Sequence, residues 1–164
     1  MAVIIVTGGG AQAVADLLAV PGASKTVLEA LVPYSDRSLA EFLGALPTQA
    51  VSIETAAAMA RTAYQRTLQL RDNPEIPVLG LSCTATLVTD RPKKGEHRAH
   101  VGLCTGTDTR VYSLTLTKGA RDRQREERVV SNLLLNTLAE ACGVQVPAEI
   151  GRLPDEQIAL ETRA

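Results

Sequence analysis

Residues 2–10 read AVIIVTGGG, a short apolar run that ends in a threonine and three glycines. The length of the run and its β-branched side chains predict a buried strand over residues 2–6. The glycines favour a tight turn, and residues 11–18 then read as a helix that Pro21 and Gly22 end. A strand that passes through a glycine turn into a helix is typical of an α/β domain.

The segments that follow continue this alternation of strands and helices. Residues 26–32 are apolar and compatible with either element, and we favour a strand because Pro33 disfavours a helical residue before it. Ser35 is a good N-cap for a short helix that Gly44 ends, and Ser52 is one for a longer helix over residues 53–70. Residues 77–83 read as a second buried strand, and a long polar loop follows over residues 84–96.

The second half of the chain adds a hairpin and one long helix. Residues 97–104 and 110–116 read as antiparallel strands, and residues 121–142 form the longest predicted helix. Residues 143–164 contain two prolines and little pattern. We therefore predict one α/β domain over residues 1–142, a three-layer α/β/α sandwich with a mixed sheet of about five strands, and a C-terminal tail over residues 143–164.

Composition narrows the classes of function. The chain has 164 residues, of which 45% are hydrophobic and 2% aromatic, and its net charge is -1. These values exclude general disorder and argue against nucleic-acid or anionic-membrane binding, because both require an excess of Lys and Arg. Three cysteines without a C-x-x-C motif suggest reduced thiols, and no apolar run approaches the roughly 20 residues that span a bilayer. We therefore expect a soluble, cytoplasmic protein with no nucleic-acid and no membrane partner.

Four short motifs carry a resemblance to a known family. They are Thr7-Gly8-Gly9-Gly10, Val20-Pro21-Gly22-Ala23-Ser24, Val32-Pro33-Tyr34-Ser35 and Ala50-Val51-Ser52-Ile53-Glu54-Thr55-Ala56. In this order and spacing the motifs resemble the C-terminal domain of the CinA (competence/damage-inducible) family, over about residues 3–142. Members of that family include nicotinamide mononucleotide (NMN) deamidases, so the resemblance implies an α/β/α amidohydrolase fold.

The chain departs from that family at the two positions that carry its chemistry. With the family's Thr-Gly-Gly laid on residues 7–9, its nucleophilic serine falls on Ile5. With the family's Tyr-Ser laid on residues 34–35, its lysine falls on Leu39. Nucleophilic catalysis needs an activated hydroxyl and a nearby base, and neither side chain supplies one. We therefore expect the deamidase activity to be absent.

The resemblance also implies a binding site between the glycine loop and the last helix. The N–H groups at a helix start favour an anion, and the family's Gly-Asp-Arg matches Asp122 and Arg123, so we expect a small anionic ligand such as a nucleoside phosphate and no cofactor. The candidate ligand-binding residues are Thr7, Gly8, Gly9, Gly10, Tyr34, Ser82 and Arg123. The alternatives are a turn that needs glycine for its backbone, a solvated arginine and a core tyrosine.

Two further expectations concern metals and self-association. His97 and His100 are spaced i, i+3, and on a strand they point to opposite faces, so we expect no metal site. The chain starts at its first strand, without the helix that usually precedes it in the family, so we expect part of the sheet to need cover. A homo-oligomer, most simply a symmetric homodimer, would provide it.

Two other functions stay open at this point. One is an enzyme with a rebuilt site that uses Thr7, Ser82 or Cys83, and the other is a partner-binding scaffold without a ligand. Convergence of Thr7, Tyr34, Ser82 and Arg123 on one concave pocket would favour binding or catalysis over the scaffold.

Overall fold

The computed structural model describes residues 1–145 and 149–163. The elements, in chain order, are β1 (Ala2–Thr7), α1 (Ala11–Leu18), the short 3-10 helix η1 (Ala23–Lys25), β2 (Val27–Leu31), α2 (Asp36–Leu43), α3 (Ile53–Leu70), β3 (Leu79–Thr86), β4 (His97–Cys104), β5 (Thr109–Leu116), α4 (Arg123–Ala141) and β6 (Ile158–Arg163). The α/β character predicted from the alternating pattern is confirmed.

The strands form one mixed sheet in the order β2-β1-β3-β4-β5-β6. β1 runs parallel to β2 and β3, and the pairs β3–β4, β4–β5 and β5–β6 are antiparallel. The sheet has six strands instead of about five, and the additional strand is β6. Its sequence, IALETR, is mostly exposed at the sheet edge, so it lacks the apolar pattern of a buried strand.

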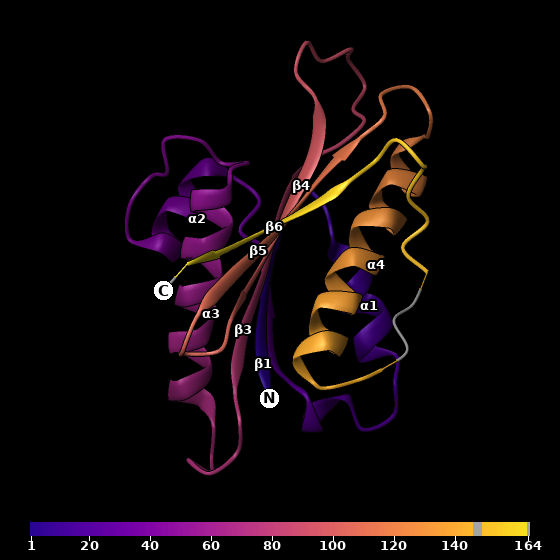
Figure 1. Cartoon of the computed structure of the whole chain (residues 1–164). Helices are drawn as coiled ribbons and strands as arrows, with labels where there is room; N and C mark the ends of the chain where they lie inside the picture. The colour runs from indigo at the N-terminus through magenta and orange to yellow at the C-terminus, as the bar shows by residue number, and fades with distance from the viewer. Residues whose placement is uncertain (146–148, 164) are drawn as a thin grey trace.

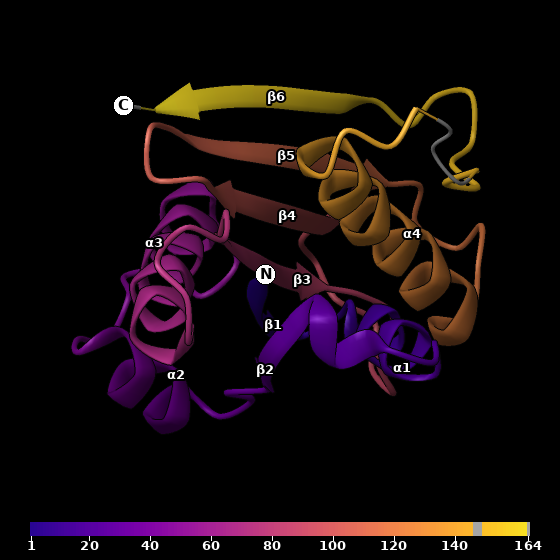
Figure 2. The same ribbon diagram turned by 90° about the horizontal axis from the view of Figure 1, so that it is seen from below.

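The helices form two layers, one on each face of the sheet. Figures 1 and 2 show α1 and α4 on one face and α2 and α3 on the other. The larger apolar cluster lies on the α1/α4 face and includes Ile4, Leu81 and Leu134. A smaller cluster on the other face contains Val3, Ile5, Leu39, Met59 and Ala63. This arrangement is the predicted three-layer α/β/α sandwich.

Helix α3 packs unusually close to the sheet, and β3 is adapted to it. A Cβ atom at Gly80 would lie 2.2 Å from the carbonyl oxygen of Ala60 and 2.2 Å from the backbone nitrogen of Tyr64. Ser82, which is fully buried on the same face, donates a hydrogen bond of 2.7 Å to the carbonyl oxygen of Ala56. Only small side chains fit between the backbone of α3 and this part of β3.

Strand β3 is longer than the sequence predicts. Pairing with β4 continues through Thr84, Ala85 and Thr86, so the strand does not end at Cys83 and the loop that follows covers residues 87–96. The extra residues gain ladder hydrogen bonds from β4, and long-range pairing of this kind leaves no local signal.

A buried ion pair holds the segment that leads to β6. Glu156 is 1% exposed and accepts hydrogen bonds from the backbone N–H groups of Thr117 (2.8 Å) and Leu153 (2.6 Å) and from Nη2 of Arg121 (2.8 Å). Burial opposes ionisation, but hydrogen bonds from Arg121 and from these two N–H groups outweigh it and lower the pKa of Glu156 to about 2. The pair therefore fixes the C-terminal segment against the turn between β5 and α4.

Candidate functional site

A cavity of about 350 Å³ opens at the carboxyl end of β1. It is bounded by the glycine loop, the first turns of α1 and α4, and the segment after β2, and its lining consists of Val6, Thr7, Gly8, Gly9, Ala11, Gln12, Ala15, Val32, Tyr34, Arg123, Gln124 and Glu127. In open α/β sheets, the carboxyl ends of the strands are the usual place for a ligand. We refer to this space as the glycine-loop cavity.

Most of the candidate residues predicted from the sequence meet here. The lining contains Thr7, Gly8, Gly9, Tyr34 and Arg123, while Gly10 follows directly as the N-cap of α1. Ser82 does not reach the cavity. It lies on the opposite face of the sheet, because side chains alternate along β3 and its hydroxyl is bonded to α3.

The two positions at which the chain departs from the CinA pattern lie together in the core. Ile5 and Leu39 are 0% and 2% exposed and belong to one apolar cluster with Met59. Neither side chain lines the glycine-loop cavity. At both positions the chain therefore has an apolar side chain in a closed part of the core.

Two of the side chains considered for a rebuilt catalytic site, Cys83 and Thr7, lie in environments that do not activate them among the described residues. Cys83 is fully buried, and burial together with the nearby Glu127 carboxylate raises the pKa of its thiol well above the ordinary range. The thiol therefore stays protonated at neutral pH and is a poor nucleophile. Within residues 1–145 and 149–163, the Thr7 hydroxyl has no hydrogen bond to a histidine, lysine or carboxylate that would serve as its base.

Gly8 requires glycine for two structural reasons. Its φ of +74° lies in the left-handed region, and a Cβ atom would stand 1.9 Å from the carbonyl oxygen of Ala85. The glycine loop thus lies directly against the end of β3. This requirement is independent of any ligand.

The N–H groups at the start of α1 already bind a carboxylate of the chain itself. Glu127 accepts hydrogen bonds from the backbone nitrogens of Gly10 (3.1 Å, to Oε2) and Gln12 (3.0 Å, to Oε1). The Ser131 hydroxyl donates to Oε1 at 3.2 Å and accepts a bond of 3.1 Å from the N–H of Ala13. The sequence gives no signal for this contact, because Glu127 stands in a run of mixed charge and lies 117 positions from Gly10.

Arg123 is fixed at the cavity by two carbonyl oxygens. Its Nη2 donates to Gly8 O at 2.8 Å, and its Nη1 donates to Val88 O at 3.1 Å. None of the ion pairs among the described residues includes Arg123. Its positive charge therefore has no carboxylate partner in that part of the chain.

The same helical turn also holds the loop over residues 87–96. Glu126 is fully buried, and its carboxylate lies 2.7 Å from Nδ1 of His97 and accepts a bond of 2.8 Å from the N–H of Val88. Arg123 and Glu126 thus bind the carbonyl and the N–H of one residue, Val88. Together with Glu127, which binds the start of α1, these two residues form what we call the α4 clamp.

The second histidine, His100, lies on the other face of the sheet. Its Nδ1 is 2.8 Å from the Ser113 hydroxyl, and burial, with a smaller effect from Arg98, lowers the pKa of its imidazole. Since His97 and His100 face opposite layers, they share no ligand. Among the described residues no group of three or more His, Cys, Asp or Glu side chains could hold a metal ion.

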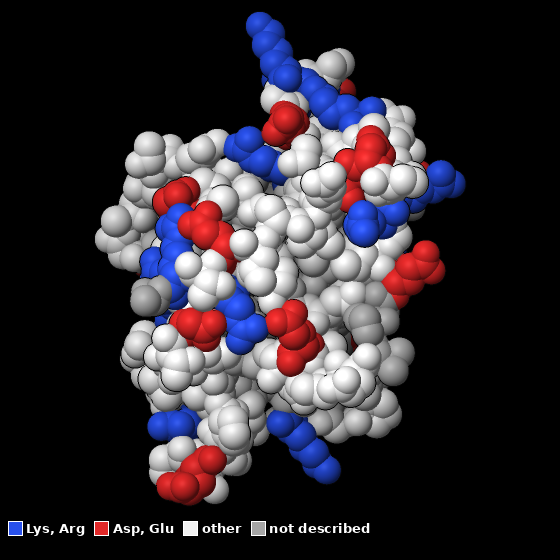
Figure 3. Space-filling model, viewed as in Figure 1, with Lys and Arg blue, Asp and Glu red and all other residues white. Residues whose placement is uncertain are grey.

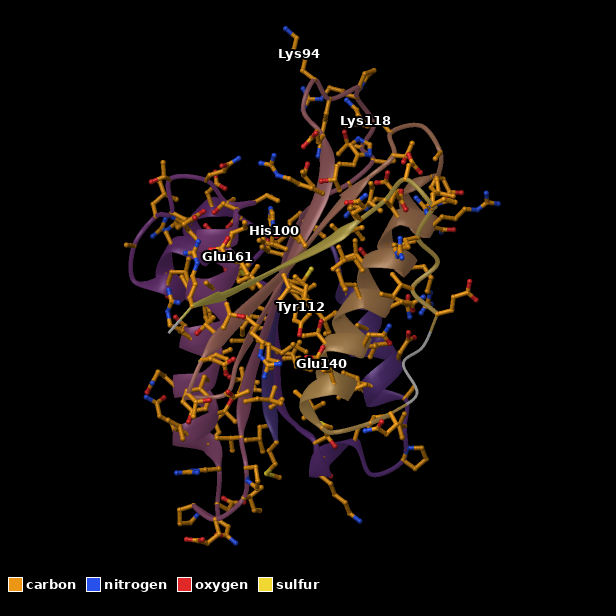
Figure 4. The ribbon with its side chains drawn as sticks, viewed as in Figure 1. Lys94, His100, Tyr112, Lys118, Glu140 and Glu161 are labelled. Atoms are coloured by element: carbon orange, nitrogen blue, oxygen red, sulfur yellow. The ribbon has the colours of Figure 1, made fainter. Side chains whose placement is uncertain are left out.

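A larger cavity, of about 450 Å³, lies between α4 and the strands β5 and β6. At its polar end, the Tyr112 hydroxyl donates to the Glu140 carboxylate at 2.8 Å (Figure 4), and Arg110 pairs with the same carboxylate at 2.9 Å. Burial and Glu140 together raise the pKa of Tyr112 to about 12. The charged groups here are paired with one another, so this cavity offers less to a charged ligand than the glycine-loop cavity does.

The surface carries both signs of charge. Figure 3 shows basic and acidic side chains interspersed across the face that carries β6. Within the described part of the chain, no helix has the length and apolar character needed to cross a membrane.

The sequence matches no protein-family model and no curated protein sequence. The structure is similar to solved structures of CinA proteins. A CinA superfamily protein from Escherichia coli aligns with a TM-score of 0.63 and 15% identity over 85% of this chain and 78% of that one. The competence/damage inducible protein CihA from Agrobacterium tumefaciens gives 0.63 and 19%, over 84% and 83% of the two chains. A competence or damage-inducible protein from Enterobacter asburiae gives 0.61 and 18%, over 84% and 85%. The chain therefore shares the fold of these solved structures.

Proposed function

We propose that this CinA-fold chain has no amidohydrolase activity and binds a nucleoside phosphate or a similar small anion in the glycine-loop cavity. The observation that carries the proposal is the state of Arg123. Two of the five guanidinium N–H donors are used on Gly8 O and Val88 O, and no carboxylate neutralises the charge within the described residues. A fixed, unpaired arginine in a concave site is suited to a phosphate or carboxylate.

Glu127 sets where the anion binds. Because its carboxylate takes the N–H groups of Gly10 and Gln12, a phosphate at the helix start would have to displace it. A phosphate at the helix start would also lie close to the Glu127 carboxylate, and two negative charges repel each other strongly in a partly buried site. The anion therefore binds at Arg123, at the α4 side of the cavity, and the glycines contribute the shape of the wall.

Titration calorimetry with inorganic phosphate and adenosine monophosphate tests the binding. Arg123→Ala is expected to weaken anion binding about 10- to 100-fold, the value of a hydrogen-bonded charge. The matched control is Arg125→Ala, since Arg125 is an exposed arginine of the same turn that stands 3.8 Å from Asp122. Equal affinities of the wild type and Arg123→Ala would contradict the proposal, and a protein that binds neither anion would favour the scaffold.

The loss of catalysis is tested separately by ammonia release from NMN. Ile5 and Leu39 offer no nucleophile and no base, so turnover is expected to stay far below the roughly 1 per second that is ordinary for enzymes. Ordinary turnover by the purified protein would show that a rebuilt site is active.

The proposal includes a symmetric homodimer in the cytoplasm. It is supported by the two open edges of the sheet, β2 and β6, and by exposed apolar side chains such as Val32 and Leu160. The free thiols of Cys83, Cys104 and Cys142 fit a reducing compartment. Light scattering is expected to give twice the chain mass of 17.4 kDa, and a strictly monomeric mass would contradict this part.

A further inference from the structure

We infer that the glycine-loop cavity binds a zwitterion, a small molecule whose anionic group contacts Arg123 and whose ammonium group contacts Glu127. The inference rests on the anion site proposed at Arg123 and adds Glu127 as a second contact, which selects a small ligand with both charges. Both charged side chains line the same cavity. They stand four residues apart on α4, so one helical turn, or about 5–6 Å between their Cβ atoms, separates them.

The two opposite charges do not neutralise each other. An arginine and a glutamate at this spacing can form an ion pair, but the described residues show none between Arg123 and Glu127. Arg123 is bound to the carbonyls of Gly8 and Val88, and Glu127 to the N–H groups of Gly10 and Gln12. Backbone groups thus fix a positive and a negative charge at a set separation.

The carboxylate of Glu127 has room for one more donor. A carboxylate offers about four acceptor positions, and three are taken by Gly10, Gln12 and Ser131. The remaining position suits an N–H donor, and an ammonium group forms a strong, charge-assisted hydrogen bond with a carboxylate. A ligand with only negative charge would leave this position empty and face repulsion from it.

The rest of the cavity suits a short side chain. Ala11, Ala15 and Val32 provide small apolar walls, and the volume of about 350 Å³ is at the lower end of the range for ligand pockets. This space accommodates a molecule of about the size of an amino acid, with its two charges close together and an apolar part beyond them.

Each probe is tested in three forms, so that the contribution of each charge to binding can be measured separately. Glycine, leucine and glutamine each exist as the zwitterion, as the N-acetyl derivative with only the carboxylate, and as the amide with only the ammonium group. Ligand-observed NMR on the wild type is expected to show at least one zwitterion binding about tenfold or more tightly than both of its derivatives, since each charged hydrogen bond has about that value.

Two variants assign the contacts. Glu127→Gln keeps an acceptor oxygen for α1 but removes the charge. In this variant the zwitterion is expected to bind no more tightly than the N-acetyl form. The N-acetyl form itself is expected to bind at least as tightly as it binds the wild type, because its repulsion from Glu127 is removed. Arg123→Gln is expected to reduce the affinity to that of the amide form. Arg125→Gln, the exposed control, is expected to change neither affinity.

The outcomes distinguish the inference from the proposed function. If no zwitterion binds the wild type more tightly than its two derivatives, the inference is wrong, even where a variant fails to fold. If the N-acetyl forms or inorganic phosphate still bind, and Arg123→Gln abolishes that binding, the proposed anion site stands without the zwitterion. If nothing anionic binds, both fail.

Discussion

Arg121 lies just before α4 and Arg123 is its first residue, and the two arginines have different partners. Arg121 is paired with the buried carboxylate of Glu156, whereas Arg123 is held by the carbonyls of Gly8 and Val88. In the pair of Arg121 and Glu156 the two charges neutralise each other and hold the C-terminal segment in place. The second arrangement fixes the orientation of a guanidinium and leaves its charge available. A carboxylate partner therefore distinguishes a structural arginine from one that is ready for a ligand.

The largest effect is expected from removing the carboxylate of the first pair. Glu156→Ala leaves the Arg121 guanidinium in a nearly closed site without its partner, and such a change costs about 3–5 kcal/mol of unfolding free energy. Urea denaturation measures it. The control is Glu161→Ala on β6, an exposed ion-pair partner of Arg163 that is expected to cost less than about 1 kcal/mol. Equal costs would show that the buried ion pair contributes no more to stability than an exposed one does.

Acid is expected to weaken the ion pair between Arg121 and Glu156. It is not expected to weaken the hydrogen bonds of Arg123 to backbone carbonyls, which do not titrate. The pKa of Glu156 is about 2 in the folded protein, against an ordinary value of 4.5, so its stabilisation is complete above about pH 5 and lost as the pH falls towards 2. Between about pH 5 and pH 2 the free energy of unfolding should fall by roughly 3 kcal/mol more for the wild type than for Glu156→Gln. Carboxyl groups common to both proteins cancel in this difference. Parallel pH profiles would contradict it.

An intermediate effect is expected at the α4 clamp. His97→Ala removes a hydrogen-bond partner from the buried Glu126 carboxylate, and an unsatisfied buried group of this kind costs about 1–3 kcal/mol. His100→Ala is the control, because it leaves only the Ser113 hydroxyl without its partner. Thermal unfolding should rank the two variants in this order, and the reverse order would show that Glu126 does not depend on His97.

The smallest effect on stability is expected at Arg123 itself. Arg123→Lys keeps the charge but cannot reach both carbonyls in the same geometry, so the cost should be about 1 kcal/mol, the value of an ordinary hydrogen bond. Expressed as free energies, the loss in anion affinity caused by Arg123→Lys should be larger than the loss in stability. A loss as large as that of Glu156→Ala would mean that Arg123 is a structural residue after all.

Local patterns predict most of the fold. The strand and glycine turn over residues 2–10, the caps Ser35 and Ser52, and the hairpin from residue 97 onward all carry short-range signals, and the structure has the corresponding elements. The edge strand β6 was beyond such signals, because its hydrogen bonds come from β5 across more than 40 positions and its side chains are mostly exposed.

The candidate site was predictable only in part. Thr7, Tyr34 and Arg123 come from motifs matched in order, and the structure brings them to one cavity. The sequence predicts that Ser82 lies near the end of a strand, but β3 runs on to Thr86, and the alternation of side chains turns Ser82 towards α3. The sequence does not predict that Glu127 belongs to the site, since nothing local distinguishes it from the neighbouring charged residues of the same run.

The position of β6 has a consequence for synthesis of the chain. During translation β6 leaves the ribosome after the other five strands, so the sheet can assemble as β2-β1-β3-β4-β5 while Arg121 still lacks Glu156. In that interval β5 is an open edge, the kind of surface on which nascent chains pair with each other. When residues 156–163 are added, β6 pairs with β5 and Glu156 neutralises Arg121. Cover for the edge of β5 and the carboxylate partner of Arg121 therefore come from the same C-terminal segment.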